Sequence, residues 1–270
     1  MTGHTHDVAV VLVLAGHDPS GGAGIQADIE TLASLRCHAT PVITALTAQN
    51  TQRLVSVHPA DPSAFSEQVS LLMADIQPQA LKIGLLTNVS IVRRIHKLVL
   101  DHPTIPVILD PVLSAGTGQQ LADDTVVDAV AELLLPLTTV LTPNSDEARR
   151  LASHSEDLNS AAEKLMNQGC KFVLITGTHE PTATVVNQLY GEGQHLKTFQ
   201  WGRLAGNYLG SGCTLSAAIA GLIARGLDVN AAVEQAQAYT WAALRHARRL
   251  GSGQYHPNRL FWGRYRWDHT

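Results

Sequence analysis

The chain contains few cysteines and few charged residues. Its 270 residues include three cysteines, Cys37, Cys170 and Cys213, and 16% charged residues. The cysteines are widely spaced and form no C-x-x-C pair, which argues against a thiolate zinc site and is typical of a reducing compartment. The formal net charge is −4, so we expect no basic stripe and no nucleic-acid partner.

Signals for secretion and for membrane insertion are also missing. The N-terminal residues MTGHTHD lack a basic region followed by an apolar one. The strongest apolar run near that end, residues 8–15, is far too short to span a bilayer. These absences predict a cytoplasmic protein without a membrane partner.

Two common nucleotide-binding fingerprints are absent. A glycine-rich turn at residues 16–24 precedes a helical pattern, as in dinucleotide-binding proteins, but Ala27 breaks the G-x-G-x-x-G spacing. No G-x-x-x-x-G-K-[ST] sequence occurs, which argues against a P-loop enzyme. The chain also shows no internal repeat, low-complexity segment or linker, so we expect one domain over residues 1–270.

Apolar runs alternate with helical periodicity along most of the chain. We expect strands at residues 8–15, 41–46, 81–86, 107–110, 139–141 and 172–176, and helices at 25–36, 62–73, 89–100, 123–135, 158–168 and 229–250, with a further helix starting at 142–147. Residues 184–190 and 196–201 predict a hairpin. This alternation predicts an α/β fold with three layers, a mostly parallel central sheet with helices on both faces. The run at 8–15 predicts a strand buried on both faces.

Glycine and polar residues follow many of the expected strands. They are Gly16, Gln49, Gly84, Asp110, Asn144, Gly177 and the loop that begins at Gly210. Because the carboxyl ends of parallel strands share one edge of a sheet, we expect these residues to converge on one rim.

The most informative stretch is residues 206–218, GNYLGSGCTLSAA. Gly210, Ser211 and Gly212 offer backbone N–H groups with little side-chain bulk, directly before a predicted helix. Such amides and the positive end of the helix dipole form an anion site. We expect an apolar stripe on this helix, made of Leu215, Ile219, Leu222 and Ile223.

Cys213 stands at the start of that helix, where a positive helix end would lower the pKa of its thiol. An anion site that contains a potential base predicts phosphoryl transfer. The alternative is an ordinary turn of small residues with an inert, buried cysteine.

Six stretches together resemble the ribokinase superfamily and, more closely, the hydroxymethylpyrimidine/phosphomethylpyrimidine kinases of thiamine biosynthesis. They are residues 15–28 (AGHDPSGGAGIQAD), 42–51 (VITALTAQNT), 82–86 (KIGLL), 110–113 (DPVL), 142–148 (TPNSDEA) and 210–218 (GSGCTLSAA). The resemblance implies a ribokinase-like fold and a homodimer. It also implies Mg²⁺-dependent transfer of the γ-phosphoryl group of ATP, first to the hydroxymethyl group of the pyrimidine and then to the resulting monophosphate.

The resemblance also implies roles for residues. Gly210, Ser211 and Gly212 would form the anion hole, and Cys213 would take the hydroxyl proton. Gln49 would read the pyrimidine through its amide, in a pocket that Gly16, Asp28, Leu85 and Val112 complete. For Asp28 the alternative is a solvated helix residue, and for Leu85 and Val112 it is an ordinary place in the core.

On the nucleotide side, the resemblance implies that Asn144, Thr176 and Gly177 contact ATP. Glu147 and Asp110 would bind Mg²⁺ through water, which suits an ion that keeps much of its hydration shell. The alternatives for Asn144 and Asp110 are a helix cap and an acidic strand end.

Three positions depart from the family pattern. Thr176-Gly177-Thr178-His179 stands where many relatives have Lys-Gly-Gly-His, so a phosphate-binding lysine is lost unless the Thr176 hydroxyl replaces it. Tyr208-Leu209 replaces Thr-His, and His17 replaces Ser or Thr, either as a substrate contact or as a turn residue. Two other functions therefore stay open, a pyridoxal kinase-like activity and a non-catalytic pyrimidine-binding sensor.

Overall fold

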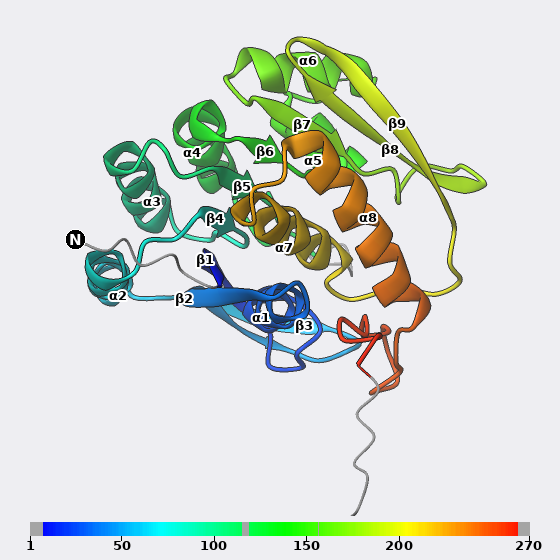
Figure 1. The fold of residues 1–270 in the computed structure, drawn as a ribbon, viewed down its shortest axis with the longest axis horizontal. Coiled ribbons are helices and arrows are strands. Elements are labelled where there is room, and N and C mark those ends of the chain that lie inside the picture. Colours follow the sequence, from blue (N-terminus) through cyan, green and yellow to red (C-terminus); the bar gives the residue numbers. More distant parts are fainter. Residues whose placement is uncertain (1–7, 115–118, 156, 264–270) are drawn as a thin grey trace, which may run out of the picture.

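A computed structural model describes residues 8–114, 119–155 and 157–263 of the chain (Figure 1). Its strands are β1 (Ala9–His17), β2 (Cys37–Gln49), β3 (Leu54–Pro59), β4 (Ala80–Ile83), β5 (Val107–Leu109), β6 (Val140–Leu141), β7 (Phe172–Ile175), β8 (Thr184–Gly191) and β9 (Gln194–Gly202). They form one sheet in the order β3-β2-β1-β4-β5-β6-β7-β8-β9. The pairs from β2 to β7 are parallel, whereas β3, β8 and β9 join antiparallel.

Helices cover both faces of this sheet. They are α1 (Gly24–Ser34), α2 (Pro62–Asp75), α3 (Val89–Asp101), α4 (Asp124–Leu133), α5 (Ser145–Leu151), α6 (Leu158–Asn167), α7 (Ser211–Ala224) and α8 (Val229–Arg245), with a short 3-10 helix at Leu135–Leu137. One hydrophobic cluster joins α1, α7 and α8 to the sheet, and a second joins α2 to α6 to its other face. The predicted three-layer α/β/α fold is confirmed.

Strand β1 shows why its sequence is a continuous apolar run. Val11 and Val13 belong to the cluster beneath α1 and α7, whereas Leu12 and Leu14 belong to the opposite cluster. Successive side chains of a strand point to opposite faces, so a central strand between two helix layers needs apolar residues at every position. The prediction that this strand is buried on both faces is confirmed.

Some boundaries differ from the prediction. Strand β3 was not expected, because its sequence LVSVHP is mixed and ends in proline, and only pairing with β2 organises it. Strand β4 ends at Ile83 rather than 86, and helix α8 ends at Arg245 rather than 250. After α8, Arg248 pairs with His256 as the chain turns back on itself.

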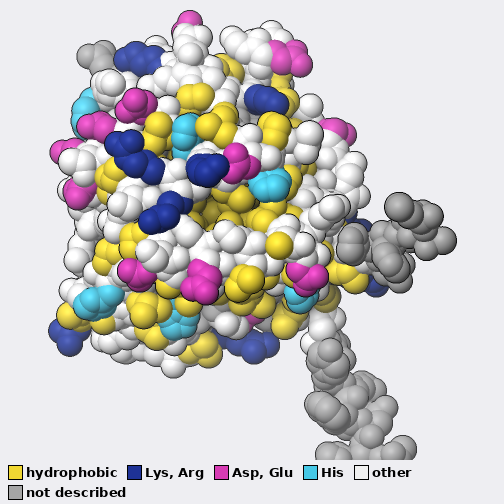
Figure 2. Space-filling view, turned by 90° about the vertical axis from the view of Figure 1, so that its left-hand side faces the viewer, with side chains coloured by type: hydrophobic (Ala, Val, Ile, Leu, Met, Phe, Trp, Pro, Cys, Tyr) yellow, Lys and Arg dark blue, Asp and Glu magenta, His cyan; other side chains and the backbone are white. Residues whose placement is uncertain are grey.

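On the face that Figure 2 shows, basic and acidic side chains lie interspersed. Each helix of the described residues falls short of the length or the apolar character that a membrane crossing requires. The N-terminal residues MTGHTHD lie outside the described residues.

Helix α7 differs in kind from its prediction, because it is buried all round rather than along one stripe. Every residue from 214 to 222 is buried. The helix packs between α1 and α8 and against β1, β4 and β5. Its small residues allow this close packing: a Cβ on Gly221 would lie 2.9 Å from Leu32 Cδ2. The expectation of a one-sided stripe was wrong, because alanine and glycine on the opposite face are packing residues here.

This packing can be tested at Ala217, which lies opposite the expected stripe and is 0% exposed. We expect Ala217→Leu to lower the free energy of unfolding by about 1–3 kcal/mol, because extra methylenes overpack a filled interior. Urea denaturation measures this change. The same substitution at the exposed Ala64 of α2 is the control and should stay within about 0.5 kcal/mol. A neutral effect at Ala217 would contradict burial of that face.

Candidate active site

Loops at the carboxyl ends of the parallel strands enclose a cavity of about 870 Å³. Twelve residues expected in the site line it: Gly16, Gln49, Leu85, Asp110, Val112, Asn144, Glu147, Thr176, Gly210, Ser211, Gly212 and Cys213. Gln49 and Cys213, which lie far apart in the sequence, therefore share one space. Asp28, Gly84 and Gly177 are not part of its wall.

The N-terminus of α7 is open toward this cavity. Gly210 is the N-cap residue, with φ at 74°, and no side chain caps the helix. Thr214 N donates to Gly210 O at 2.9 Å, so the amides of residues 211 to 213 precede the first intrahelical hydrogen bond. Uncapped amides at a positive helix end can bind an anion such as a phosphoryl group.

Gly210 is required by close packing as well as by its backbone angle. A Cβ at this position would lie 2.1 Å from Gly22 O. The glycine-rich turn after β1 therefore rests directly on the loop that begins α7. Two glycine-rich segments from opposite ends of the chain form one wall of the site.

Cys213 has a thiol whose pKa burial raises to about 12. The ammonium of Lys82 and a hydrogen bond from Gly24 N oppose this rise, but Asp110 adds to it. The expectation of a lowered pKa was wrong, because burial disfavours the charged thiolate. The carboxylate of the neighbouring Asp110, whose own pKa is raised by burial, accepts a hydrogen bond from Ser216 Oγ at 3.2 Å.

Lys82 is the functional residue that the sequence interpretation missed. It lines the cavity, is 0% exposed, and places its Nζ 3.0 Å from Asp28 Oδ2 and 4.0 Å from Asp110 Oδ2. Its signal was visible as a single charged residue inside the apolar strand ALKI. A lysine in such a strand is almost always paired.

Asp28 was expected either in the pyrimidine pocket or as a solvated helix residue, and it is neither. It is not solvated, since it is 0% exposed, and it lies outside the cavity wall, behind Lys82. Burial raises the pKa of Asp28 to about 6, and the ammonium of Lys82 limits the rise. Its contribution to the site is therefore to hold Lys82.

The cavity wall also contains residues expected to bind the pyrimidine ring. A Cβ on Gly16 would lie 2.8 Å from Leu85 Cδ2, so the glycine allows Leu85 to reach the cavity. Val112 also lines it. Gln49 ends β2, where a β-bulge at Ala48/Gln49 shifts the pairing with β3. A bulge changes the direction of the side chains next to it.

Asn144 and Glu147 form a capping box at the start of α5. Asn144 Oδ1 accepts from Glu147 N at 2.9 Å, and Glu147 Oε2 accepts from Asn144 N at 3.0 Å. The cap alternative for Asn144 is thus correct, and the residue lines the cavity as well. Burial and the nearby Asp110 raise the pKa of Glu147 to about 8. A bound cation would offset the charge of Glu147 and of the nearby Asp110, so these two carboxyl groups suit one.

The loop after β7 contains the first departure from the family pattern. Thr176 lines the cavity, whereas Gly177 lies against β8, where a Cβ would be 2.1 Å from Val186 O. Arg203 lines the same region and donates from Nη1 to Thr178 O at 2.8 Å and from Nη2 to Glu180 O at 3.0 Å. This guanidinium brings positive charge to the part of the cavity where the family lysine is absent.

The other two departures from the family pattern, at Tyr208-Leu209 and at His17, also have defined surroundings in the structure. Tyr208 packs on Tyr255, with ring centroids 5.8 Å apart, and Leu209 N donates to Tyr255 O at 2.9 Å. The pair 208–209 therefore binds the C-terminal part of the chain. His17 lies between two cavities and lines both.

A helix-end anion site beside paired acid and thiol groups, at the rim of this sheet, defines a small-molecule kinase of the ribokinase-like class. Residues 18–258 match the family profile described as phosphomethylpyrimidine kinase. The chain belongs to this family.

Individual relatives agree with this family. The hydroxymethylpyrimidine/phosphomethylpyrimidine kinase of Synechococcus elongatus is 38% identical over 92% of this chain and 95% of its own length. The enzyme of the same name from Bacillus subtilis is 34% identical over 90% of this chain and 91% of its own.

Solved structures with the same fold include two kinds of kinase. The pyridoxal kinase of Staphylococcus aureus in complex with pyridoxal has a TM-score of 0.86 and 26% identity, covering 95% of each chain. The phosphomethylpyrimidine kinase of Clostridium difficile 630 has a TM-score of 0.77 and 30% identity, covering 87% of this chain and 99% of its own.

The raised pKa of Glu147 predicts a pH dependence of stability in the absence of ligands and metal. The folded protein holds this proton up to about pH 8, whereas the ordinary value for the unfolded chain is 4.5. The stabilisation is therefore complete below pH 4.5 and is lost as pH rises to 8. We expect Glu147→Gln to reduce the fall in urea midpoint over this range, measured in EDTA. Glu132→Gln, on the exposed side of α4, is the control, and equal slopes for wild type and Glu147→Gln would contradict the assignment.

Proposed function

We propose that the chain transfers the γ-phosphoryl group of ATP to 4-amino-5-hydroxymethyl-2-methylpyrimidine and then to its monophosphate, for thiamine biosynthesis. The observation that carries this proposal is the single cavity shared by Gln49 and Cys213. The wall of this cavity offers an amide and apolar side chains for a heteroaromatic ring. It also offers helix-end amides for a transferring phosphoryl group.

In the proposed step, the hydroxymethyl oxygen forms a bond to the γ-phosphorus as the bond from that phosphorus to the β–γ bridging oxygen breaks. The hydroxyl proton passes to the Cys213 thiol, which passes its own proton to the neighbouring Asp110 carboxylate. The pair gains one proton and ADP leaves. Lys82, beside both side chains, offsets the negative charge that collects there. The helix-end amides bind the charge on the phosphoryl group.

The residues present suit Mg²⁺, which would neutralise phosphate charge when bound. Glu147 and Asp110 are the carboxyl groups for it, through water, because this ion retains most of its hydration shell. Asn144 fixes the Glu147 side chain through the capping box. Thr176 and Arg203 supply a hydroxyl and a cation toward the nucleotide. Gly177, in the turn directly after Thr176, completes the proposed nucleotide-binding residues. A homodimer in the cytoplasm completes the proposal.

A B6 vitamer kinase is the second candidate, because pyridoxal kinases are among the structures with this fold and pyridoxal also has a ring with a hydroxymethyl group. The test is ADP release with Mg-ATP and either hydroxymethylpyrimidine or pyridoxal. We expect a higher kcat/KM for the pyrimidine, followed by formation of its diphosphate. Faster turnover of pyridoxal would favour the second candidate. Pyrimidine binding without ADP release would favour the third possibility, a non-catalytic pyrimidine-binding sensor.

The proposed role of Cys213 predicts a loss of turnover. We expect Cys213→Ala to lower kcat by about 10²–10⁴-fold, the range for removal of a general base. The dissociation constant of the pyrimidine, measured by calorimetry, should change little. Cys170→Ala is the matched control, since Cys170 is buried far from the cavity wall and should retain kcat. Near-normal turnover by Cys213→Ala would remove the thiol from the proton transfer.

A further inference from the structure

The C-terminal part of the chain, residues 248–263 and here called the tail, binds three separate loops of the candidate active site. Its contacts are Gln254 N to Thr51 O at 2.8 Å, Tyr255 N to Asn207 O at 2.8 Å, and His256 Nε2 with Ser20 O at 3.1 Å. These acceptors lie in the turn after Gln49, in the loop before α7 and in the glycine-rich turn after β1. Because the tail bonds to all three loops, it is placed to fix their relative positions.

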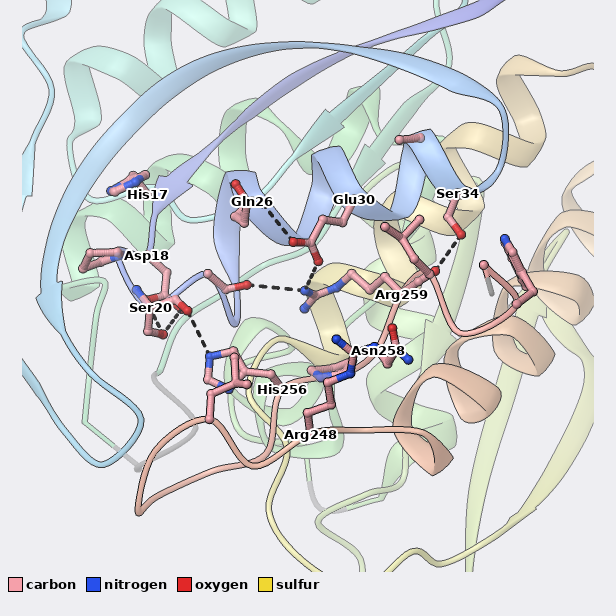
Figure 3. A pocket seen from close by; sticks show the side chains of 18 of the residues that line it. His17, Asp18, Ser20, Gln26, Glu30, Ser34, Arg248, His256, Asn258 and Arg259 are labelled. Carbon is pink, nitrogen blue, oxygen red and sulfur yellow. Dashed lines mark hydrogen bonds and ion pairs between the residues drawn. The ribbon is translucent and has the colours of Figure 1, made fainter. Parts of the chain in front are cut away.

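Arg259 is the most buried charged residue of the tail, with 2% exposed surface. Its guanidinium points inward between α1 and the glycine-rich turn, in the wall of a second cavity of about 1040 Å³ (Figure 3). Nη1 lies 3.0 Å from Glu30 Oε2, so the charge is paired. A buried arginine needs such partners, and its planar set of five donors fixes their relative geometry.

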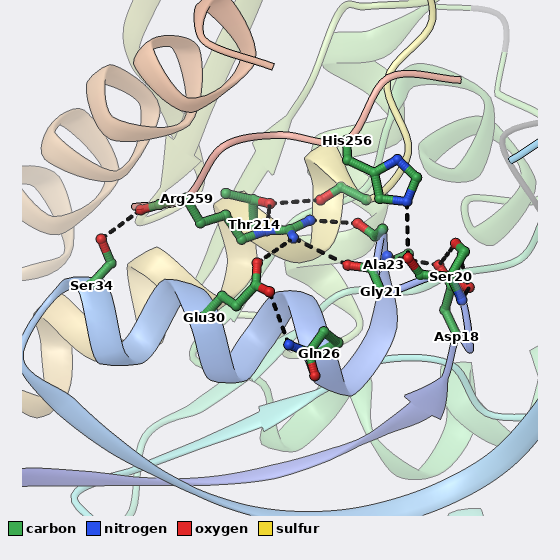
Figure 4. A network of polar contacts seen from close by, with 12 residues as sticks. Asp18, Ser20, Gly21, Ala23, Gln26, Glu30, Ser34, Thr214, His256 and Arg259 are labelled. Atoms are coloured by element: carbon green, nitrogen blue, oxygen red, sulfur yellow. Dashed lines mark hydrogen bonds and ion pairs between the residues drawn. The ribbon is translucent and has the colours of Figure 1, made fainter. Parts of the chain in front are cut away.

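The remaining donors of Arg259 reach both glycine-rich segments of the site (Figure 4). Nη1 and Nη2 donate to Gly21 O and Gly22 O, and Nε donates to Thr214 Oγ1 at 2.9 Å. The Thr214 hydroxyl in turn donates to Gly210 O at 2.8 Å. Hydrogen bonds therefore run without a break from the tail to the first residue of the anion site.

The guanidinium joins two segments that already touch. Gly210 rests on Gly22 O, and a Cβ on Gly22 would lie 2.5 Å from Leu209 Cδ2. A shift of the turn away from α7 would thus move Ala23 and Gly24, which line the cavity, relative to the amides and the thiol at the start of α7. Displacements of about 1 Å can lower a rate about 10²-fold, because phosphoryl transfer depends on alignment.

We propose that Arg259 is a positioning residue for phosphoryl transfer, which holds the glycine-rich turn at residues 21–24 against the anion loop at 210–213. The proposal rests on the function proposed above. Arg259 lies one residue beyond the range that matches the family profile, 18–258. Its side-chain hydrogen bonds and ion pair reach none of Gln49, Leu85 and Val112, three of the residues expected to bind the pyrimidine.

The first test is the kinetics of Arg259→Met, which keeps the length and apolar stem of the side chain. We expect kcat to fall about 10–100-fold, with less than a threefold change in KM for the pyrimidine. Ser34→Ala and Tyr239→Phe are matched controls. Both side chains donate to the backbone oxygen of Arg259, at 2.6 and 2.8 Å, so they anchor the same tail without reaching either loop. These two variants should keep kcat within about twofold.

Thr214 supplies a second test that leaves the tail intact. Thr214→Val removes the hydroxyl between Arg259 and Gly210 at nearly constant shape, whereas Thr214→Ser retains it. We expect a loss of kcat for valine and its recovery for serine. The double variant Arg259→Met/Thr214→Val should lose little more than either single variant, because both interrupt one chain of hydrogen bonds.

Hydrogen–deuterium exchange of the ligand-free chains separates this inference from the proposed function. We expect Arg259→Met to accelerate exchange in peptides that cover residues 18–24 and 207–216, and the two tail controls to leave them unchanged. Wild-type protein that releases no ADP would refute the proposed function, while the exchange result would still decide whether Arg259 holds the loops. Unchanged exchange and kcat in Arg259→Met, or equal losses in Ser34→Ala, would overturn the inference.

Discussion

A buried ammonium group is the interaction on which the rest of the site depends. Lys82 is fully buried on β4, in contact with Asp28 and within 4.0 Å of Asp110. Without this positive charge, the interior would hold two carboxylates beside the point where an anion is to bind. Breaking a buried ion pair by removing one partner costs about 3–5 kcal/mol. The charge of Lys82 therefore serves the folded state and the anion site at the same time.

The anion site itself is made of backbone, and backbone can be placed only by packing. Gly210 and Gly22 approach each other more closely than any side chain would allow. Helix α7 is buried on every side, which fixes the direction of its N-terminus relative to the sheet. The tail then closes the same region from outside, through Thr214 and the glycine-rich turn. A site of this kind depends on segments from both ends of the chain.

The departures from the family pattern have physical counterparts in the structure. Arg203 brings a cation to the loop after β7, where the family lysine is missing. Tyr208 and Leu209, which replace Thr-His, contact Tyr255 in the tail. The loop before α7 and the tail are therefore matched to each other.

Much of the fold was predictable from residue order. The alternation of apolar runs with helical periods predicted most elements of the sheet and its two helix layers, because these patterns reflect local geometry. Strand β3 was missed, since its mixed sequence becomes a strand only by pairing with β2. The one-sided burial expected for α7 was wrong, because alanine and glycine carry no local signal of a packed face.

The candidate site, like the fold, was predictable from the sequence only in part. The sequence by itself determined which residue types follow the strands, and hence that Gln49, Asp110 and Cys213 would gather at one rim. It did not determine their charge states, because a pKa depends on burial and on neighbours from other strands. Only the tertiary structure decided that Lys82 pairs with Asp28, that the Cys213 thiol keeps its proton, and that Arg259 reaches the anion loop. These are contacts between residues far apart in sequence, and no local pattern encodes the distance between them.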